Sequence, residues 1–250
     1  MAVFDYIIVG AGSAGCVLAN RLSADHAARV LLLEAGPRDT DPWIHVPLGY
    51  GKLFNRKRVN WSYESEPEPN LGGRRIFTPR GKVLGGSSSI NGLVYIRGQA
   101  EDFDAWEVPG WSFGELLPYF RRSEGSLGVS DIERHEIGDA FIASARAIGI
   151  PANDDFNGER QEGTGYYRAT TKDGRRSSTA VAYLRPAARR PNLRVETEAL
   201  ATRVLFEGKR ARAVAWEQGG VRHEARAARE VLLCGGSFNS PQLLQLSGVG

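Results

Sequence analysis

The sequence predicts an α/β fold: a mainly parallel sheet with an inserted antiparallel β-meander and part of a second domain. Three observations predict it. At the N-terminus an apolar strand leads through a glycine-rich turn into a helix. Residues 193–227 hold four short segments of period two, and residues 231–234 form an all-apolar run that ends in glycines. Such a run is typical of a strand buried on both faces of a parallel sheet, so we expect the chain to return there to its first sheet.

The first thirty-six residues justify a Rossmann-like sheet. Residues 6–9 form a strand, the turn reads Gly10-Ala11-Gly12-Ser13-Ala14-Gly15, a helix runs to about Ala24, and a second strand covers residues 30–33. In such turns the first glycine permits the tight bend, the second lets the backbone approach a pyrophosphate, and the third lets the helix pack on the strand. The helix N-terminus offers N–H groups to the phosphates. The pattern predicts a dinucleotide site; a glycine-rich turn without a ligand is the alternative.

Glu34 ends the second predicted strand, nineteen residues after Gly15. In dinucleotide-binding folds an acidic side chain about 20 residues after the turn hydrogen-bonds a ribose hydroxyl. We therefore expect the Glu34 carboxylate to bind an adenosine ribose. An NAD(P)-dependent dehydrogenase would use the same first thirty-six residues and is kept as an alternative.

Composition argues against several classes of protein. The chain has 250 residues and a net charge of +3, and its longest apolar runs are strand-sized, so we expect neither a membrane-spanning segment nor nucleic-acid binding. Met1 leads almost directly into the first strand, and a cytoplasmic protein without a leader is the expectation. Cys16 and Cys234 should be buried, reduced thiols. The four histidines stand far apart, so we expect no metal site.

Residues 37–79 are rich in Pro, Asn, Gly and Trp and have little periodicity. Long irregular stretches serve as lids or cofactor covers, or lie extended over a core. We expect an extended cover segment anchored by Trp43, Trp61 and Tyr63. Their rings suit simple packing and contact with a flat cofactor equally well.

Residues 80–95 form the second informative stretch and read RGKVLGGSSSINGLVY. Paired glycines beside three serines let the main chain come close to a planar or anionic ligand and turn its N–H groups toward it. A generic Ser/Gly loop is the alternative.

At this stretch the chain resembles a known family. Residues 81–98, GKVLGGSSSINGLVYIRG, look like the first signature of the glucose–methanol–choline (GMC) oxidoreductases, which use FAD. Residues 236–250, GSFNSPQLLQLSGVG, look like the second signature. Residues 94–106 and 157–183 most resemble the choline-dehydrogenase-like bacterial branch. The resemblance runs over nearly the whole chain.

The resemblance implies an FAD-dependent enzyme that oxidises an alcohol by hydride transfer to the flavin. It places the glycine-rich turn on the pyrophosphate, Glu34 on the adenosine ribose and residues 80–94 beside the isoalloxazine. The cofactor-binding residues expected on this basis are Gly10, Gly12, Ser13, Ala14, Gly15, Glu34, Ala35, Trp61, Arg80, Val83, Gly85, Gly86, Ser87, Asn91, Gly92, Leu93, Val94, Val204 and Gly235.

The resemblance also bears on the chemistry at the flavin. It places the catalytic base in a C-terminal histidine, paired with a second His or an Asn, and no residue of this chain corresponds to either, so no catalytic residue is assigned. Some choline oxidases have, at the position of Ile90, a histidine that bonds covalently to the flavin. Because isoleucine has no nucleophilic atom, we expect FAD to be held non-covalently. A family member with different flavin chemistry, such as a photodecarboxylase, is a further alternative.

Ordinary signals predict the elements between the motifs. Ser112 and Glu115 form a capping box for a helix that Pro118 should distort. A second helix is expected over residues 136–147, ending at Gly149. Its inward-facing residues should be Phe141, Ile142 and Ala145.

The rest of the chain is expected to alternate loops and strands. Residues 151–190 should give a polar loop, a strand near residues 166–171, a turn at residues 172–174 and a helix capped by Ser177 or Ser178. An antiparallel meander should follow, with strands at residues 193–197, 202–207, 211–217 and 221–227. Ser240 as the cap and Pro241 as the first residue predict a last helix.

These signals divide the chain. Residues 1–36 and 192–250 should bind FAD, with residues 80–98 as a flavin-covering loop, and residues 99–191 should lead toward a substrate domain. The chain stops inside a motif at Gly250, so we expect it to be the N-terminal part of a protein about twice as long. Family members also have a longer loop between the positions of Glu124 and Gly125, which indicates either a deletion or residues missing from the sequence.

Overall fold

The computed structural model describes residues 1–250. The chain forms two compact units. The first consists of Met1–Gly92 and Ser177–Gly250, and the second of Leu93–Arg176. No helix is long and apolar enough to cross a membrane.

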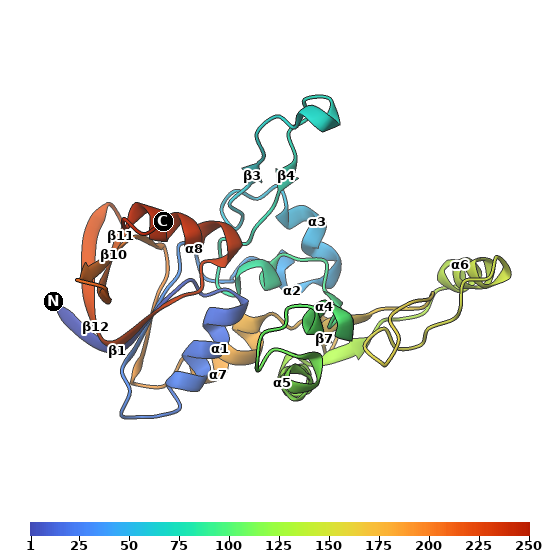
Figure 1. Cartoon of the computed structure of the whole chain (residues 1–250), viewed down its shortest axis with the longest axis horizontal. Coiled ribbons are helices and arrows are strands. Elements are labelled where there is room, and N and C mark those ends of the chain that lie inside the picture. The colour runs from blue at the N-terminus through green and yellow to red at the C-terminus, as the bar shows by residue number, and fades with distance from the viewer. The chain divides into compact units, whose positions relative to one another are not determined.

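A six-stranded sheet with the order β10-β11-β12-β1-β2-β9 organises the first unit (Figure 1). Its strands are β1 (Ala2–Val9), β2 (Val30–Leu33), β9 (Leu193–Glu196), β10 (Ala199–Glu207), β11 (Arg210–Gln218) and β12 (Val221–Leu233). The pairs β12–β1, β1–β2 and β2–β9 are parallel, whereas β10–β11 and β11–β12 are antiparallel. The predicted mixture of a parallel sheet and a meander is thus confirmed.

The structure corrects the predicted meander at both of its ends. Residues 193–197 were expected in it, but β9 pairs in parallel with β2 and belongs to the Rossmann-like part. Residues 221–227 and 231–233 were expected to be two strands and form one, β12. Its first part pairs with β11 and its last part with β1. The last part is half-buried rather than buried on both faces, because β11 pairs only as far as Arg226 and leaves one edge of β12 open.

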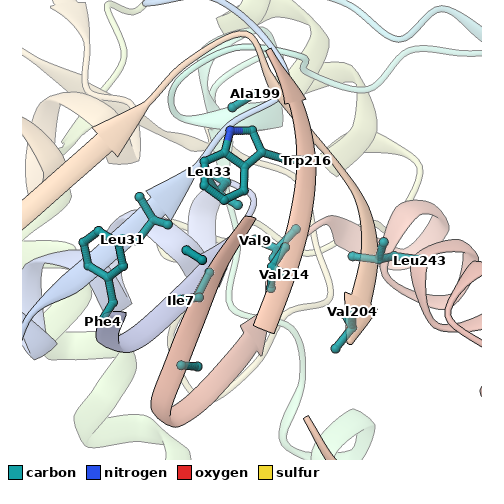
Figure 2. Close-up of a cluster of buried hydrophobic side chains, with 12 residues drawn as sticks. Phe4, Ile7, Val9, Leu31, Leu33, Ala199, Val204, Val214, Trp216 and Leu243 are labelled. Carbon is teal, nitrogen blue, oxygen red and sulfur yellow. The ribbon is translucent and has the colours of Figure 1, made fainter. Parts of the chain in front are cut away.

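The main core lies on one face of this sheet (Figure 2). The register sets Ile7 beside Leu31 and Val9 beside Leu33, so these four side chains point the same way. The meander and the last helix cover them. The covering residues include Ala199, Val204, Val214, Trp216 and Leu243.

Helix α1 (Ser13–Leu22) covers the opposite face, where Ile8 is fully buried. It ends at Leu22, two residues before the predicted Ala24. The C-cap residue is Ser23, whose hydroxyl donates to the carbonyl of Ala19 (2.6 Å). The π-helical turn η4 (Ala180–Leu184) and the short helix α7 (Arg185–Ala187) pack against α1. The predicted cap of this segment is confirmed at Ser178, whose hydroxyl accepts the N–H of Val181 (3.3 Å).

The predicted cover segment contains only short elements. They are α2 (Pro42–His45), η1 (Pro47–Gly49), α3 (Tyr50–Leu53), β3 (Tyr63–Glu64), η2 (Pro69–Leu71) and β4 (Phe77–Thr78), followed by η3 (Gly86–Ser89). A small second core holds the segment together, with Trp43 packed against it. Its members are Ile44, Leu53, Val59, Val83 and Ile90. The β3–β4 hairpin carries η2 at its tip (Figure 1).

The last helix, α8 (Gly236–Leu246), begins five residues earlier than Ser240 and Pro241 predicted. Gly235 stands at the cap position, and Pro241 lies inside the helix. Because proline has no N–H, Pro241 leaves the carbonyl of Ser237 without its i→i−4 partner within the helix.

The second unit combines a small sheet with three helices. The strands are β5 (Val94–Tyr95), β6 (Val129–Asp131), β7 (Arg168–Lys172) and β8 (Arg175–Arg176), and the helices are α4 (Ala100–Asp104), α5 (Phe113–Leu127) and α6 (Glu136–Ala147). The β7–β8 turn has Asp173 and Gly174 at positive φ, as its sequence predicted.

Both predicted helices of this unit are present. The capping box of Ser112 and Glu115 starts α5. The helix then continues without interruption through Glu124 and Gly125. This is the position at which family members were expected to have a longer loop than this chain. The predicted inward face of α6 is wrong at Phe141, which is 70% exposed, and right at Ala145. Only a small part of α6 is covered by this chain, so its apolar positions are not all buried.

Candidate functional site

A cavity of about 890 Å³ opens at the carboxyl ends of the parallel strands of the first unit. Val9, Leu33 and Leu233, the last residues of β1, β2 and β12, all line it. Open α/β sheets bind their ligands at this edge. The cavity also takes in eleven of the predicted cofactor residues: Gly10, Gly12, Ser13, Ala14, Glu34, Ala35, Trp61, Arg80, Gly86, Ser87 and Gly235.

The three glycines of the first turn meet different surroundings. Gly10 has a φ of +100°, and a Cβ there would lie 2.5 Å from the carbonyl oxygen of Cys234. A Cβ on Gly15 would lie 1.9 Å from the carbonyl oxygen of Gly10. A Cβ on Gly12 would meet nothing closer than 3.9 Å. Gly10 and Gly15 are therefore required by the protein's own packing, whereas Gly12 borders open space in the cavity.

Helix α1 starts at the cavity without a side-chain cap. Gly12 is the cap residue and has no side chain to bond the first N–H groups of the helix. Ser13 and Ala14, at the first helical positions, line the cavity. The positive end of the helix is therefore turned toward the cavity, an arrangement that attracts phosphate.

The second glycine-rich stretch packs directly on the first turn. The N–H of Gly85 donates to the carbonyl of Ala11 (2.7 Å). Gly86 has a φ of +55°, and a Cβ on it would lie 2.7 Å from the Cα of Gly12. Any larger side chain at position 86 would separate the two segments. Gly86 and Ser87 therefore continue the wall that Gly12 begins.

Glu34 is 5% exposed, and its carboxylate hydrogen-bonds the backbone of two segments at the edge of the cavity. Its Oε2 accepts the N–H of Ala11 (2.9 Å) and its Oε1 accepts the N–H of Gly36 (2.9 Å). Burial raises the pKa of this carboxyl to about 7, although the two N–H donors and nearby Lys82 favour the charged form. Glu34 thus holds the first turn against the end of β2 as well as facing the cavity.

An aromatic wall closes another side of the cavity. The rings of Trp61 and Tyr63 stack at 5.8 Å, and Tyr63 meets Phe238 edge-on at 5.7 Å. The Tyr63 hydroxyl bonds Asn239 Oδ1 (2.5 Å), and Arg80 lies over the Phe238 ring (5.1 Å). These contacts join the β3–β4 hairpin to the start of α8. Of the three predicted anchors, Trp61 and Tyr63 face the cavity, whereas Trp43 packs on the second core.

The other predicted site residues do not line the cavity. They are Gly15, Val83, Gly85, Asn91, Gly92, Leu93, Val94 and Val204. Val83 and Val204 are buried in the two cores, and Val204 donates its N–H to the Ser247 hydroxyl (2.8 Å). Leu93 and Val94 belong to the second unit.

Some cavity residues were missed by the sequence reasoning. Residues 199–202 line the cavity because the N–H of Ala199 donates to the carbonyl of Glu34 (2.9 Å), a contact between distant parts of the chain. Residues 236–239 also line it. The second signature motif contains them, so it could have been used to find Phe238 and Asn239.

The two cysteines lie near the turn and are free. The Cys16 thiol donates to the carbonyl of Ala11 (3.1 Å), and burial raises its pKa to about 12. Cys234 lines the cavity, and burial raises its thiol pKa as well. Both thiols are therefore protonated at neutral pH and poor nucleophiles.

Comparison with known proteins agrees with this geometry. The GMC oxidoreductase family matches residues 4–250. The chain is 48% identical to the alcohol dehydrogenase [acceptor] of Pseudomonas putida, over 99% of this chain and 49% of the relative. It is 46% identical to the mitochondrial choline dehydrogenase of Mus musculus, over 99% of this chain and 46% of the relative. The chain thus spans about half the length of these relatives.

Solved structures of flavoenzymes also superpose closely on this chain. Pyridoxine 4-oxidase from Mesorbium loti superposes with a TM-score of 0.93 at 33% identity, covering 99% of this chain and 52% of that one. An FAD-dependent oxidoreductase from Chaetomium thermophilum superposes with a TM-score of 0.88 at 27% identity, covering 99% and 48%. The GMC oxidoreductase family and its structural neighbours are FAD-binding flavoproteins, and the Chaetomium thermophilum protein is named as FAD-dependent. With its family match over residues 4–250 and relatives at up to 48% identity, the chain belongs to the GMC oxidoreductase family.

Proposed function

We propose that the cavity of the first unit holds FAD without a covalent bond, and that the full-length protein oxidises an alcohol. When bound, FAD supplies the acceptor for the hydride that leaves the alcohol carbon. This chain supplies the residues that would bind the cofactor. We assign no catalytic base to it.

The residues at the cavity fit each part of the cofactor. Gly12 leaves room for a pyrophosphate, and the uncapped start of α1 offers N–H groups to its charge. The Glu34 carboxyl group would accept hydrogen bonds from the adenosine ribose. Residues 199–202 would border the adenosine half, in place of the predicted Val204. Arg80, Gly86 and Ser87 would lie along the path toward the flavin.

The observation that carries this proposal is the contact between the two glycine-rich stretches. A nicotinamide-dependent Rossmann enzyme needs the turn at residues 10–15. It does not need a second glycine-rich segment packed on that turn. Here Gly85 bonds to Ala11, and Gly86 approaches Gly12 too closely for any other side chain. Family membership supports the same choice of cofactor.

The alcohol class follows from the relatives. Those named above are alcohol and choline dehydrogenases, so we propose a small alcohol as the substrate. We also propose a cytoplasmic location for the protein.

The test is the visible spectrum of the full-length protein under anaerobic conditions. We expect flavin absorbance that an alcohol such as choline or a short primary alcohol bleaches. A colourless protein that binds a nicotinamide cofactor would overturn the proposal in favour of a nicotinamide dehydrogenase. A yellow protein that ignores alcohols but consumes a fatty acid under blue light would favour the photodecarboxylase alternative.

A further inference from the structure

A second cavity, of about 550 Å³, lies in the first unit and shares no lining residue with the cofactor cavity. Two short stretches of the cover segment form its walls, residues 37–42 and residues 56–59. Its volume falls within the range of about 300–1,000 Å³ found for small-molecule sites. The proposed function gives this cavity no role.

The charged residues that line this cavity are mostly positive. Four of the nine lining residues are cationic: Arg38, Arg56, Lys57 and Arg58. The one acid, Asp41, is already engaged, because its carboxylate pairs with the Arg56 guanidinium and accepts the N–H of Trp43 (3.0 Å). The other three cations are exposed and form no ion pair. Four positive charges less one negative charge leave the lining at +3.

The two walls are fixed in place before any ligand arrives. The N–H of Leu84 donates to the carbonyl of Pro37 (3.1 Å), and the N–H of Lys82 donates to the carbonyl of Val59 (2.8 Å). Both walls are therefore bound to the same buried stretch around Val83. The Asp41–Arg56 pair links them a second time. A fixed pocket loses little entropy when it binds, so modest contacts can give measurable affinity.

We propose that this cavity binds a compact anion of the phosphate class, separate from the cofactor. Arginine side chains present forks of N–H donors that match phosphate oxygens in pairs. The exposed cationic side chains around the cavity concentrate small anions from solution and repel cations. The Thr40 hydroxyl adds a neutral donor to the lining.

The test uses the full-length protein saturated with FAD, so that the probe cannot enter the cofactor cavity. Isothermal titration with pyrophosphate at fixed ionic strength should show one site, with inorganic phosphate binding more weakly and citrate more weakly still. In the double variant Arg38→Gln/Arg58→Gln, which loses two charge-assisted contacts, pyrophosphate affinity should decrease by a factor of about ten or more.

A matched control variant distinguishes the loss of cavity contacts from the effect of a lower net charge on pyrophosphate affinity. Arg121→Gln/Arg122→Gln on α5 removes the same two charges from exposed side chains that form no ion pair, and should leave the affinity unchanged. Absence of pyrophosphate binding, equal binding in both double variants, or citrate binding as tightly as pyrophosphate would each overturn the proposal. If the protein purifies without FAD, comparing the two double variants still shows which cavity binds pyrophosphate. The affinity of pyrophosphate bound in the cofactor cavity would not change on substitution of Arg38 and Arg58.

Discussion

At the scale of single residues, Glu34 is held by its own hydrogen bonds independently of a cofactor. Its two oxygens accept the N–H groups of Ala11 and Gly36. A carboxylate has about four lone-pair sites, so two are left for ribose hydroxyls. The sequence spacing predicts an acid at the end of this strand. It does not predict the two backbone donors, because they depend on how the turn and residues 35–36 fold around the side chain.

Glu34→Ala should weaken FAD binding to the full-length protein by about one to two orders of magnitude, since charge-assisted hydrogen bonds contribute roughly 1.5–3 kcal/mol. The measurement is the dissociation constant from flavin fluorescence titration of the apoprotein. Glu217→Ala, an exposed acid without an ion pair on β11, is the control and should bind FAD normally. An unchanged constant in Glu34→Ala would make Glu34 a structural strand end only.

Glu34 should also make stability depend on pH. Burial raises its pKa in the folded protein to about 7 from 4.5, so the folded state holds this proton more tightly than the unfolded state. Its contribution to stability is therefore fully present below pH 4.5 and is lost as the pH rises toward 7. The loss is roughly 3 kcal/mol, at 1.36 kcal/mol per pKa unit.

Urea unfolding of apoprotein and of Glu34→Gln between pH 4.5 and 7.5 checks this dependence. The difference in unfolding free energy between wild type and variant should shrink as the pH rises, because glutamine does not titrate. A difference that stays flat over this range would show that Glu34 is ionised in the folded protein throughout.

Ile90 predicts how the cofactor is held. It is 2% exposed and packs in the second core with Val83, so it serves the protein interior and offers no nucleophile. Acid denaturation of the full-length protein should release yellow FAD into the supernatant. A flavin-bearing peptide in the precipitate, seen by mass spectrometry, would show a covalent bond and contradict this.

At the scale of elements, local signals predicted what depends on neighbours in sequence. The capping box of α5 and the turn after β7 are examples, because each is decided within a few residues. Pairing partners were harder to predict. The pattern of residues 193–197 suits either a meander or a parallel strand, and only the distant β2 decides between them. The single strand β12 likewise depends on two partners, because β11 pairs with one edge of its first part and β1 with the other edge of its last part.

The link between the β3–β4 hairpin and α8 is one element-scale feature of the site. Tyr63→Phe removes the hydroxyl that bonds Asn239 while keeping the stacked ring. A neutral hydrogen bond contributes roughly 0.5–1.5 kcal/mol, so FAD should dissociate from the full-length variant about two- to ten-fold faster. Stopped-flow dilution into an FAD scavenger measures the rate.

Tyr119→Phe is the matched control for this prediction. Its side chain is 67% exposed on α5, and no hydrogen bond is lost. Equal dissociation rates in Tyr63→Phe and Tyr119→Phe would mean that the hairpin does not retain the cofactor.

Over the full length of the chain, the cavity of the first unit is the feature on which the proposed function rests. Its first unit builds a cavity at the carboxyl edge of a parallel sheet, with two backbone walls and a buried acid. The relatives are about twice as long, and their remaining half has no counterpart here. The first unit is therefore the part of the protein that would hold the cofactor.

The FAD-to-protein ratio of purified full-length Gly12→Val tests most directly whether this cavity holds the cofactor. A Cβ on Gly12 is tolerated by the protein, with no atom closer than 3.9 Å, but a valine would occupy the space assigned to the pyrophosphate. The variant should therefore fold, by circular dichroism, and carry little or no FAD. Gly114→Val, at an exposed glycine of α5 with nothing within 4 Å, should keep the wild-type ratio. A folded Gly12→Val protein with the wild-type content of FAD would show that the pyrophosphate of FAD does not lie against Gly12.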